Sequence, residues 1–172
     1  MRVTSDQYIV AALSSYRISG ERGGFGLLGN ADAGATRGTV PLVTSSSSVQ
    51  SSISIFNAST TTAASVTVTL DYINSNLPNV VRVIAVNAQA RRTFTLAELG
   101  ISPGLTAGLR YEASVPVTLT YTEYQNGDAD ATMAGTVAAR TSLFGDAFVN
   151  PDFAGSTYLE TLAFYNPASV AS

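Results

Sequence analysis

Two stretches of this chain alternate apolar and polar residues with a period of two. In "SVTVTLDYI" (65–73) the apolar positions are Val66, Val68, Leu70 and Tyr72. In "VPVTLTYTEY" (115–124) they are Val115, Val117, Leu119 and Tyr121. An extended backbone directs successive side chains to opposite faces, so each stretch is predicted to be a β-strand with one buried and one solvated side.

Other apolar stretches also predict strands. We expect them at 7–16, 25–28, 38–44, 49–57, 80–88, 91–96, 105–113, 132–139, 142–149 and 157–165. They recur at a spacing of about ten residues, separated by turn signals such as "SNLPN", "SPG" and "NGD". This spacing is typical of an antiparallel β-sandwich with roughly a hundred residues per unit. The sequence therefore predicts an all-β fold.

One helical turn is expected in "TLAELG". Thr95 and Glu98 have the spacing of a capping box, and Gly100 can close the turn in a left-handed conformation. We expect this turn to plug one end of the sandwich.

The low charge content limits the partners. Charged residues make up 12% of the chain and the net charge is −3, so no basic surface for nucleic acid is expected. The only adjacent basic pair is Arg91–Arg92. No apolar run approaches the ~20 residues that a membrane-spanning helix needs, and "MRVTSDQYIV" lacks the apolar region of a signal peptide.

The residue inventory argues against an enzyme and predicts no cofactor. The chain has no histidine, cysteine or lysine, so the usual bases that activate a serine or thiol nucleophile are missing. Acidic residues fall mostly in turns or on solvated strand faces, which disfavours a paired-carboxylate glycosidase. The glycines of "GERGGFGLLG" lack the lysine of a phosphate-binding loop.

A calcium site is a minor candidate. "NGDAD" places Asn126, Asp128 and Asp130 at alternate positions, and such oxygen ligands suit Ca²⁺. The acidic residue that completes a twelve-residue calcium loop is absent, so a solvated hairpin bend is the favoured interpretation and no metal is expected.

A weak internal repeat is hidden by its phase. "RVTSDQYIVAALSSY" (2–16) aligns with "RYEASVPVTLTYTEY" (110–124), and "VQSSISIFNAS" (49–59) aligns with "YLETLAFYNPAS" (158–169). The chain thus has the form A–B–A′, with A at 1–63, B at about 64–109 and A′ at 110–172.

Three segments carry a family resemblance. "SSISIFNASTTTAASVTVTLDY" (51–72), "NAQARRTFTLAELG" (87–100) and "GLRYEASVPVTLTYTEY" (108–124) resemble, in this order, the tandem immunoglobulin-like repeats of large secreted bacterial surface proteins. The resemblance implies an immunoglobulin-like β-sandwich, an extracellular or cell-surface location, and a structural or adhesive role. It carries over no catalytic residues.

In that register the chain is cut out of phase with its folding unit. Residues 38–140 form the complete sandwich, 1–37 the closing strands of a preceding unit, and 141–172 the opening strands of a following one. Orphaned strands expose backbone hydrogen-bonding groups and pair with other chains. We therefore expect head-to-tail self-assembly by strand complementation into a filament, sheath or surface layer. The assembly residues expected are Tyr8, Val10, Leu13, Phe144, Phe148, Phe153, Tyr158, Leu162, Phe164 and Tyr165.

Several alternatives stay open. The chain can be a fragment, or a monomer in which A and A′ flank B. The aromatic residues of 144–165 also suit an adhesin or a carbohydrate-binding repeat, and similar sandwiches decorate phage capsids. "NAS" at 57–59 is a formal N-glycosylation sequon, which in a bacterial protein would usually carry no meaning.

Overall fold

The computed structural model describes the backbone of residues 12–16, 24–28, 34–73, 76–125, 128–135, 152–153 and 156–157. Side chains are described within 34–73, 76–124 and 131–135. Most of the predicted partial units, 1–37 and 141–172, therefore lie outside the described residues, and their assignment stays a prediction.

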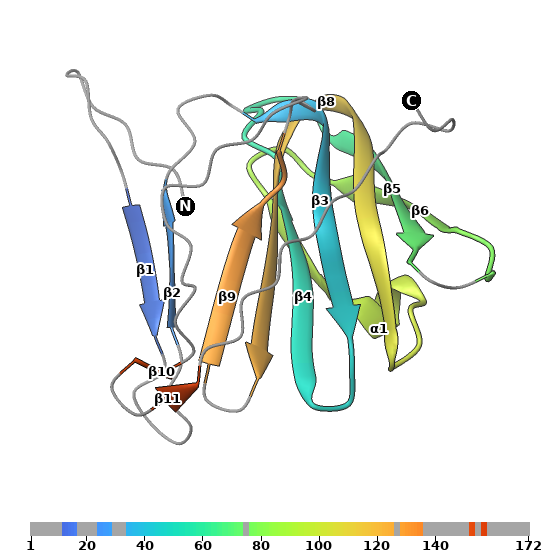
Figure 1. Cartoon of the computed structure of the whole chain (residues 1–172). Helices are drawn as coiled ribbons and strands as arrows, with labels where there is room; N and C mark the ends of the chain where they lie inside the picture. The colour runs from blue at the N-terminus through green and yellow to red at the C-terminus, as the bar shows by residue number, and fades with distance from the viewer. Residues whose placement is uncertain are drawn as a thin grey trace, which may run out of the picture.

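Strands make up nearly all of the regular structure (Figure 1). In chain order the elements are β1 (Ala12–Tyr16), β2 (Gly24–Leu28), β3 (Ala35–Ser45), β4 (Val49–Phe56), β5 (Ala64–Tyr72), β6 (Val80–Val86), β7 (Arg91–Thr95), α1 (Leu96–Leu99), β8 (Leu105–Gln125), β9 (Asp128–Met133), β10 (Asp152–Phe153) and β11 (Ser156–Thr157). Every pairing among them is antiparallel. The prediction of an all-β, antiparallel fold is confirmed.

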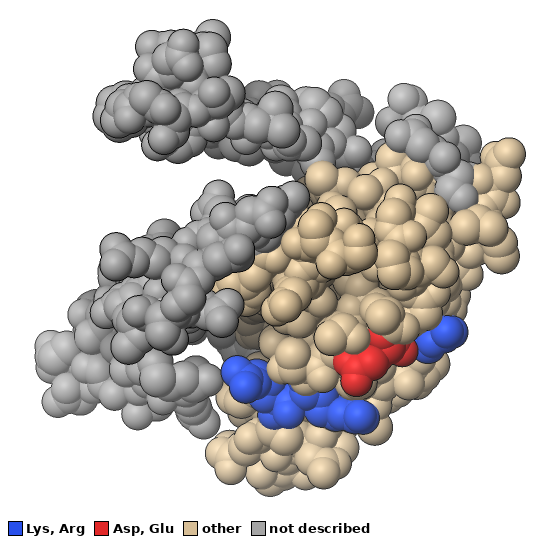
Figure 2. All heavy atoms as spheres, turned by 90° about the horizontal axis from the view of Figure 1, so that it is seen from below, with Lys and Arg blue, Asp and Glu red and all other residues tan. Residues whose placement is uncertain are grey.

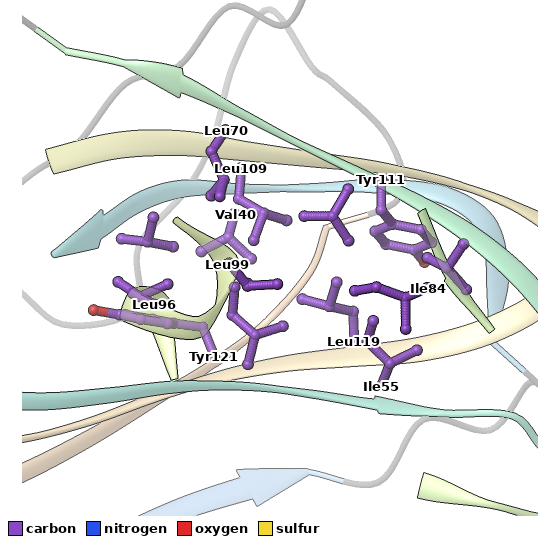
Figure 3. Close-up of a cluster of buried hydrophobic side chains, with 14 of the residues drawn as sticks. Val40, Ile55, Leu70, Ile84, Leu96, Leu99, Leu109, Tyr111, Leu119 and Tyr121 are labelled. Carbon is purple, nitrogen blue, oxygen red and sulfur yellow. The ribbon is translucent and has the colours of Figure 1, made fainter. Parts of the chain in front are cut away.

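The long strand β8 organises the main sheet. Its first half pairs with β5 and β3, and its second half pairs with β4 and β9. β6 adds to the outer side of β5, and β7 adds to the outer side of β4. The sheet curls so that these two halves face each other across the core, which gives a half-barrel (Figures 1 and 3).

The switch of partners within β8 corrects one prediction. We expected separate strands at 105–113 and 115–124, but a single strand of 21 residues runs through both. Pro116 has no N–H group and cannot donate to a continuous ladder. Close by, the hydroxyl of Ser114 accepts a hydrogen bond from the N–H of Ser65 at 2.9 Å. The "SVP" sequence therefore marks a change of partner strand and not the end of a strand.

The core lies between the two halves of the sheet (Figure 3). The alternating residues of β5 are confirmed as buried, since Val66, Val68 and Leu70 have no exposed surface. They face Ile53 and Ile55 of β4 across the core, and each fully buried aliphatic side chain of this size contributes about 1.5–3 kcal/mol to stability.

The predicted helical turn is also confirmed. The Thr95 N–H donates to Glu98 Oε2 at 2.7 Å, and the Glu98 N–H donates to Thr95 Oγ1 at 3.2 Å. Hydrogen bonds from the Thr95 backbone and hydroxyl lower the pKa of the Glu98 carboxyl. Gly100 closes the turn at φ 97°. The buried Leu96 and Leu99 extend the core at this end (Figure 3).

The segment after β8 differs from the expectation. The sequence predicts a bend in "NGDAD" (126–130) and a strand over 132–139, whereas β9 begins at Asp128 and ends at Met133. β9 pairs with the second half of β8, opposite Gln125 through Thr120. The neighbouring strand supplies hydrogen bonds that outweigh the turn preference of Asp128 and Asp130.

Candidate functional site

The candidate site is the edge strand β6. β6 pairs with β5 from Leu70↔Val80 to Ala64↔Val86 and ends the order of strands in the sheet. Within the described part of the chain, no strand pairs with its other side. Edge strands expose a row of backbone donors and acceptors on which another strand can add.

Exposed apolar side chains gather at this edge. Among the described residues the exposed large hydrophobic side chains are Leu77, Val81, Val83 and Tyr124. Val81 is 50% and Val83 71% exposed, both on the outer face of β6, and Leu77 lies just before the strand. Ala85 continues the same face and is also exposed. This stripe, Val81–Val83–Ala85, carries no charge and is called the β6 stripe below.

Two arginines contact the backbone of the β6 stripe. Arg82 Nη1 donates to the carbonyl oxygen of Val81 at 3.0 Å, and Arg92 Nη1 on β7 donates to that of Ala85 at 3.3 Å. Arg92 also lies over the ring of Phe94, 4.8 Å from its centroid. Both hydrogen bonds are solvent-exposed, and such bonds contribute little to stability.

The other edges of the curled sheet are less open. β3 is interrupted by two register shifts, and Thr39 exchanges backbone hydrogen bonds with Gly135. β7 carries Arg91 and Arg92, and like charges oppose pairing of two such strands. β9 has β2 beside it (Figure 1). Of these four edges in the described part of the chain, β6 alone combines an uncharged exposed stripe with a regular strand.

A second surface feature covers the half of the sheet that contains β4. On the outer face of β4, the residues that alternate with the buried Ile53 and Ile55 carry hydroxyl groups. The pairing register places further hydroxyl residues of β7 and β8 beside them, so that they align across three strands. Ser52 bonds to Thr122 at 2.8 Å and Ser54 bonds to Thr93 at 2.9 Å. The full set of this hydroxyl face is Ser52, Ser54, Thr93, Thr95, Thr118, Thr120 and Thr122.

Tyr121 lies in a buried polar network. Its hydroxyl accepts from the Thr44 N–H at 2.9 Å and donates to Glu123 Oε2 at 2.5 Å, while Ser51 Oγ lies 3.2 Å away. Burial and the hydrogen bond to Glu123 raise the pKa of Tyr121 to about 12. The network joins β3, β4 and β8, so its role is structural.

Asn57 is fully buried within a second network. Its Nδ2 donates to the carbonyl oxygens of Thr62, Val86 and Asn87 at 2.8, 3.1 and 3.2 Å, and its Oδ1 accepts from the Ser59 N–H. This side chain fastens the loop after β4 to the turn after β6. The nitrogen of the formal sequon is thus inaccessible to a glycan.

The residues predicted for self-assembly are mostly beyond the described part of the chain. Only the backbones of Leu13 in β1 and Phe153 in β10 are described. Tyr8, Val10, Phe144, Phe148, Tyr158, Leu162, Phe164 and Tyr165 lie outside the described residues. Their role stays a prediction.

The candidate calcium ligands do not form a metal site in the described residues. Asn126 lies outside them, and the backbones of Asp128 and Asp130 belong to β9. No group of three or more acidic, histidine or cysteine side chains there is arranged to hold a metal ion. Nor does the described chain contain a helix with the length and apolarity needed to cross a bilayer.

Charged side chains are sparse on the face seen in Figure 2. Arginines and acidic groups form a narrow band there, and the rest of its described surface is uncharged. Arg110 Nε and Asp71 Oδ2 form an ion pair of 3.1 Å, with side chains 43% and 22% exposed. An ion pair this exposed contributes at most about 1 kcal/mol.

No protein-family model matches the chain, and no curated protein matches it in sequence. Several solved structures are similar, among them the following two. "Thermotoga maritima 1070" aligns with 59% of this chain and 93% of its own, at 19% identity and a TM-score of 0.53. The Anabaena sensory rhodopsin transducer aligns with 50% of this chain and 79% of its own, at 20% identity and a TM-score of 0.44. The likeness to the Thermotoga protein extends to the fold alone.

The sequence alone does not distinguish the β6 stripe. "VVRVIAV" is apolar at nearly every position, so it predicts a strand without distinguishing the exposed side chains from the buried Ile84 and Val86. The single signal was Arg82, whose charge marks a strand that is not enclosed on all sides.

Proposed function

We propose that this chain is a structural subunit or repeat of an extracellular filament, sheath or surface layer, and that it assembles with copies of itself by β-strand pairing. The observation that carries the proposal is the open edge of β6, where Val81 and Val83 are exposed and no strand of the described chain pairs with the outward backbone groups. An edge that is regular, uncharged in its outer stripe and apolar favours the addition of a strand. The head-to-tail contact through the chain ends is a separate, additional element of this proposal.

We further propose that the curled sheet is an immunoglobulin-like sandwich unit of the tandem-repeat type. The chain order supports this: β4 leads through the Asn57 loop into β5, and α1 precedes the closing strand β8. The low charge content and the absence of histidine, cysteine and lysine favour a structural role over a catalytic one.

Electron microscopy of the purified full chain tests the proposal. We expect filaments or sheets whose abundance rises with protein concentration. Thr93→Asp places the same charge on an exposed residue of the other outer strand, β7. It is the control for Val83→Asp and should assemble like the wild type. Isolated particles of wild-type chain at every concentration would count against assembly.

Carbohydrate binding is a second candidate, favoured by the hydroxyl face. Its seven aligned hydroxyls offer donors and acceptors to a polyol without any charge. A glycan array with the wild type and with Thr120→Val tests this candidate. Binding that the valine variant weakens would support it, whereas silence of the array together with intact self-association would favour the structural role.

A further inference from the structure

We propose that β6 pairs antiparallel with β6 of a second copy, with the twofold axis passing through Val83. This inference rests on the proposed self-assembly and names the surface and the register that it uses. Such a contact is isologous and closes as a dimer, because the same patch serves both copies. Longer assemblies then need a second contact elsewhere on the chain.

The direction of the backbone groups on β6 supports this pairing. In an antiparallel strand, alternate residues direct their N–H and C=O groups to the same neighbour. The carbonyls of Val81 and Ala85 accept from Arg82 and Arg92, side chains that lie outside the β5–β6 ladder. By this alternation Val83, between them, also directs its backbone groups to the open edge. The residues with outward backbone groups are therefore those of the β6 stripe.

The charge of Arg82 selects the register. With the axis at Val83, Val83 faces Val83 of the second copy and Val81 faces its Ala85. Arg82 then faces an isoleucine, Ile84. Moving the axis to Arg82 would set two guanidinium groups directly opposite each other, which is destabilising. Moving it to Ile84 would shift the partner of Val81 to Asn87, beyond the end of β6.

The exposure of the side chains in the β6 stripe favours the same arrangement. Val83 is the more exposed valine, at 71%, and lies at the centre of the proposed contact. Val81, at 50% exposed, meets the small Ala85, so the two stripes combine into one uncharged band on the outer face. The arginine contacts weaken this pairing without preventing it, since the guanidinium occupies one lone pair of the carbonyl oxygen and the other can still accept a hydrogen bond.

Cysteine crosslinking tests the register, because the chain contains no cysteine. Directly opposite residues of a hydrogen-bonded pair have Cα atoms about 5.5 Å apart, within the range of a disulfide. Val83→Cys should crosslink under mild oxidation and shift the band from 17.8 kDa to twice that mass. Val81→Cys alone should not, but mixed with Ala85→Cys it should. Thr93→Cys, exposed on β7, is the matched control for random collision.

The outcomes separate this inference from the proposed function. If light scattering shows the wild-type chain to associate while Val83→Cys crosslinks no faster than Thr93→Cys, the β6 pairing is wrong and self-assembly stands. If the wild-type chain is monomeric at high concentration, both are wrong. Crosslinking of Val81→Cys alone at the rate of Val83→Cys would overturn the register.

Discussion

Arg92 on β7 donates from Nη1 to the carbonyl oxygen of Ala85 on β6, at 3.3 Å. The contact joins the two end strands of the curled sheet. The guanidinium of Arg92 also lies over the ring of Phe94. The same carbonyl belongs to the backbone row that a second copy would use. Arg92 therefore competes with a partner strand.

Arg92→Ala is expected to strengthen self-association, because it frees the Ala85 carbonyl. It should lower the free energy of unfolding by no more than about 1 kcal/mol, since the hydrogen bond is exposed. Sedimentation equilibrium measures the association. Arg91→Ala removes the same charge from the adjacent exposed position and is the control; equal association of the two variants would contradict this role of Arg92.

Val68→Asp should unfold the domain. Val68 has no exposed surface, and an unpaired carboxylate buried at the centre of β5 has no compensating partner. Circular dichroism and urea denaturation measure the loss. The control is Thr69→Asp, one residue along on the outer face and opposite Arg110, which should fold normally. A folded Val68→Asp domain of wild-type stability would refute the assigned facing of β5.

Asn57→Ala should destabilise the domain by at least about 2 kcal/mol. The substitution removes a fully buried side chain that donates to three carbonyl groups and accepts from the Ser59 N–H, and a lost hydrogen bond in a buried network costs about 1–3 kcal/mol. Thr60→Ala, at an exposed position of the same loop, should cost little. Urea denaturation compares the two, and similar midpoints would mean that the Asn57 network is not a fastening point.

Tyr121→Phe should change how the free energy of unfolding depends on pH in the alkaline range. The pKa of Tyr121 is raised from 10.0 in the unfolded chain to about 12 in the folded protein. A raised pKa contributes stability that is fully present below pH 10 and is lost as the pH rises toward about 12. The Tyr121→Phe variant should have a lower free energy of unfolding than the wild type at neutral pH. This free energy should fall less than that of the wild type as the pH rises from 10.0 to about 12.

The measurement is the free energy of unfolding against pH, with a tyrosinate absorbance titration beside it. Tyr124→Phe, a more exposed tyrosine of the same strand, is the control. Parallel stability curves for wild type and Tyr121→Phe above pH 10 would show that the phenol is not held neutral by burial.

Local patterns in the sequence were sufficient for several elements. Alternation predicted the buried side of β5 because a half-buried strand repeats every two residues. Thr95, Glu98 and Gly100 predicted α1 because a capping box is formed by residues only three apart.

Non-local pairing set what the sequence could not predict. The continuity of β8 past Pro116 depends on β4 and β9 taking over from β5 and β3. The exposure of Val83 depends on which strand ends the sheet, whereas its sequence context resembles that of a buried strand. An edge is defined by the absence of a neighbour, and short-range periodicity does not report neighbours.

Light scattering across a concentration series tests the central claim most directly. We predict a wild-type mass that rises above 17.8 kDa with concentration, and a Val83→Asp variant that is folded and shifted toward 17.8 kDa. A wild-type chain that stays a sharp 17.8 kDa monomer at the highest concentration would contradict the account.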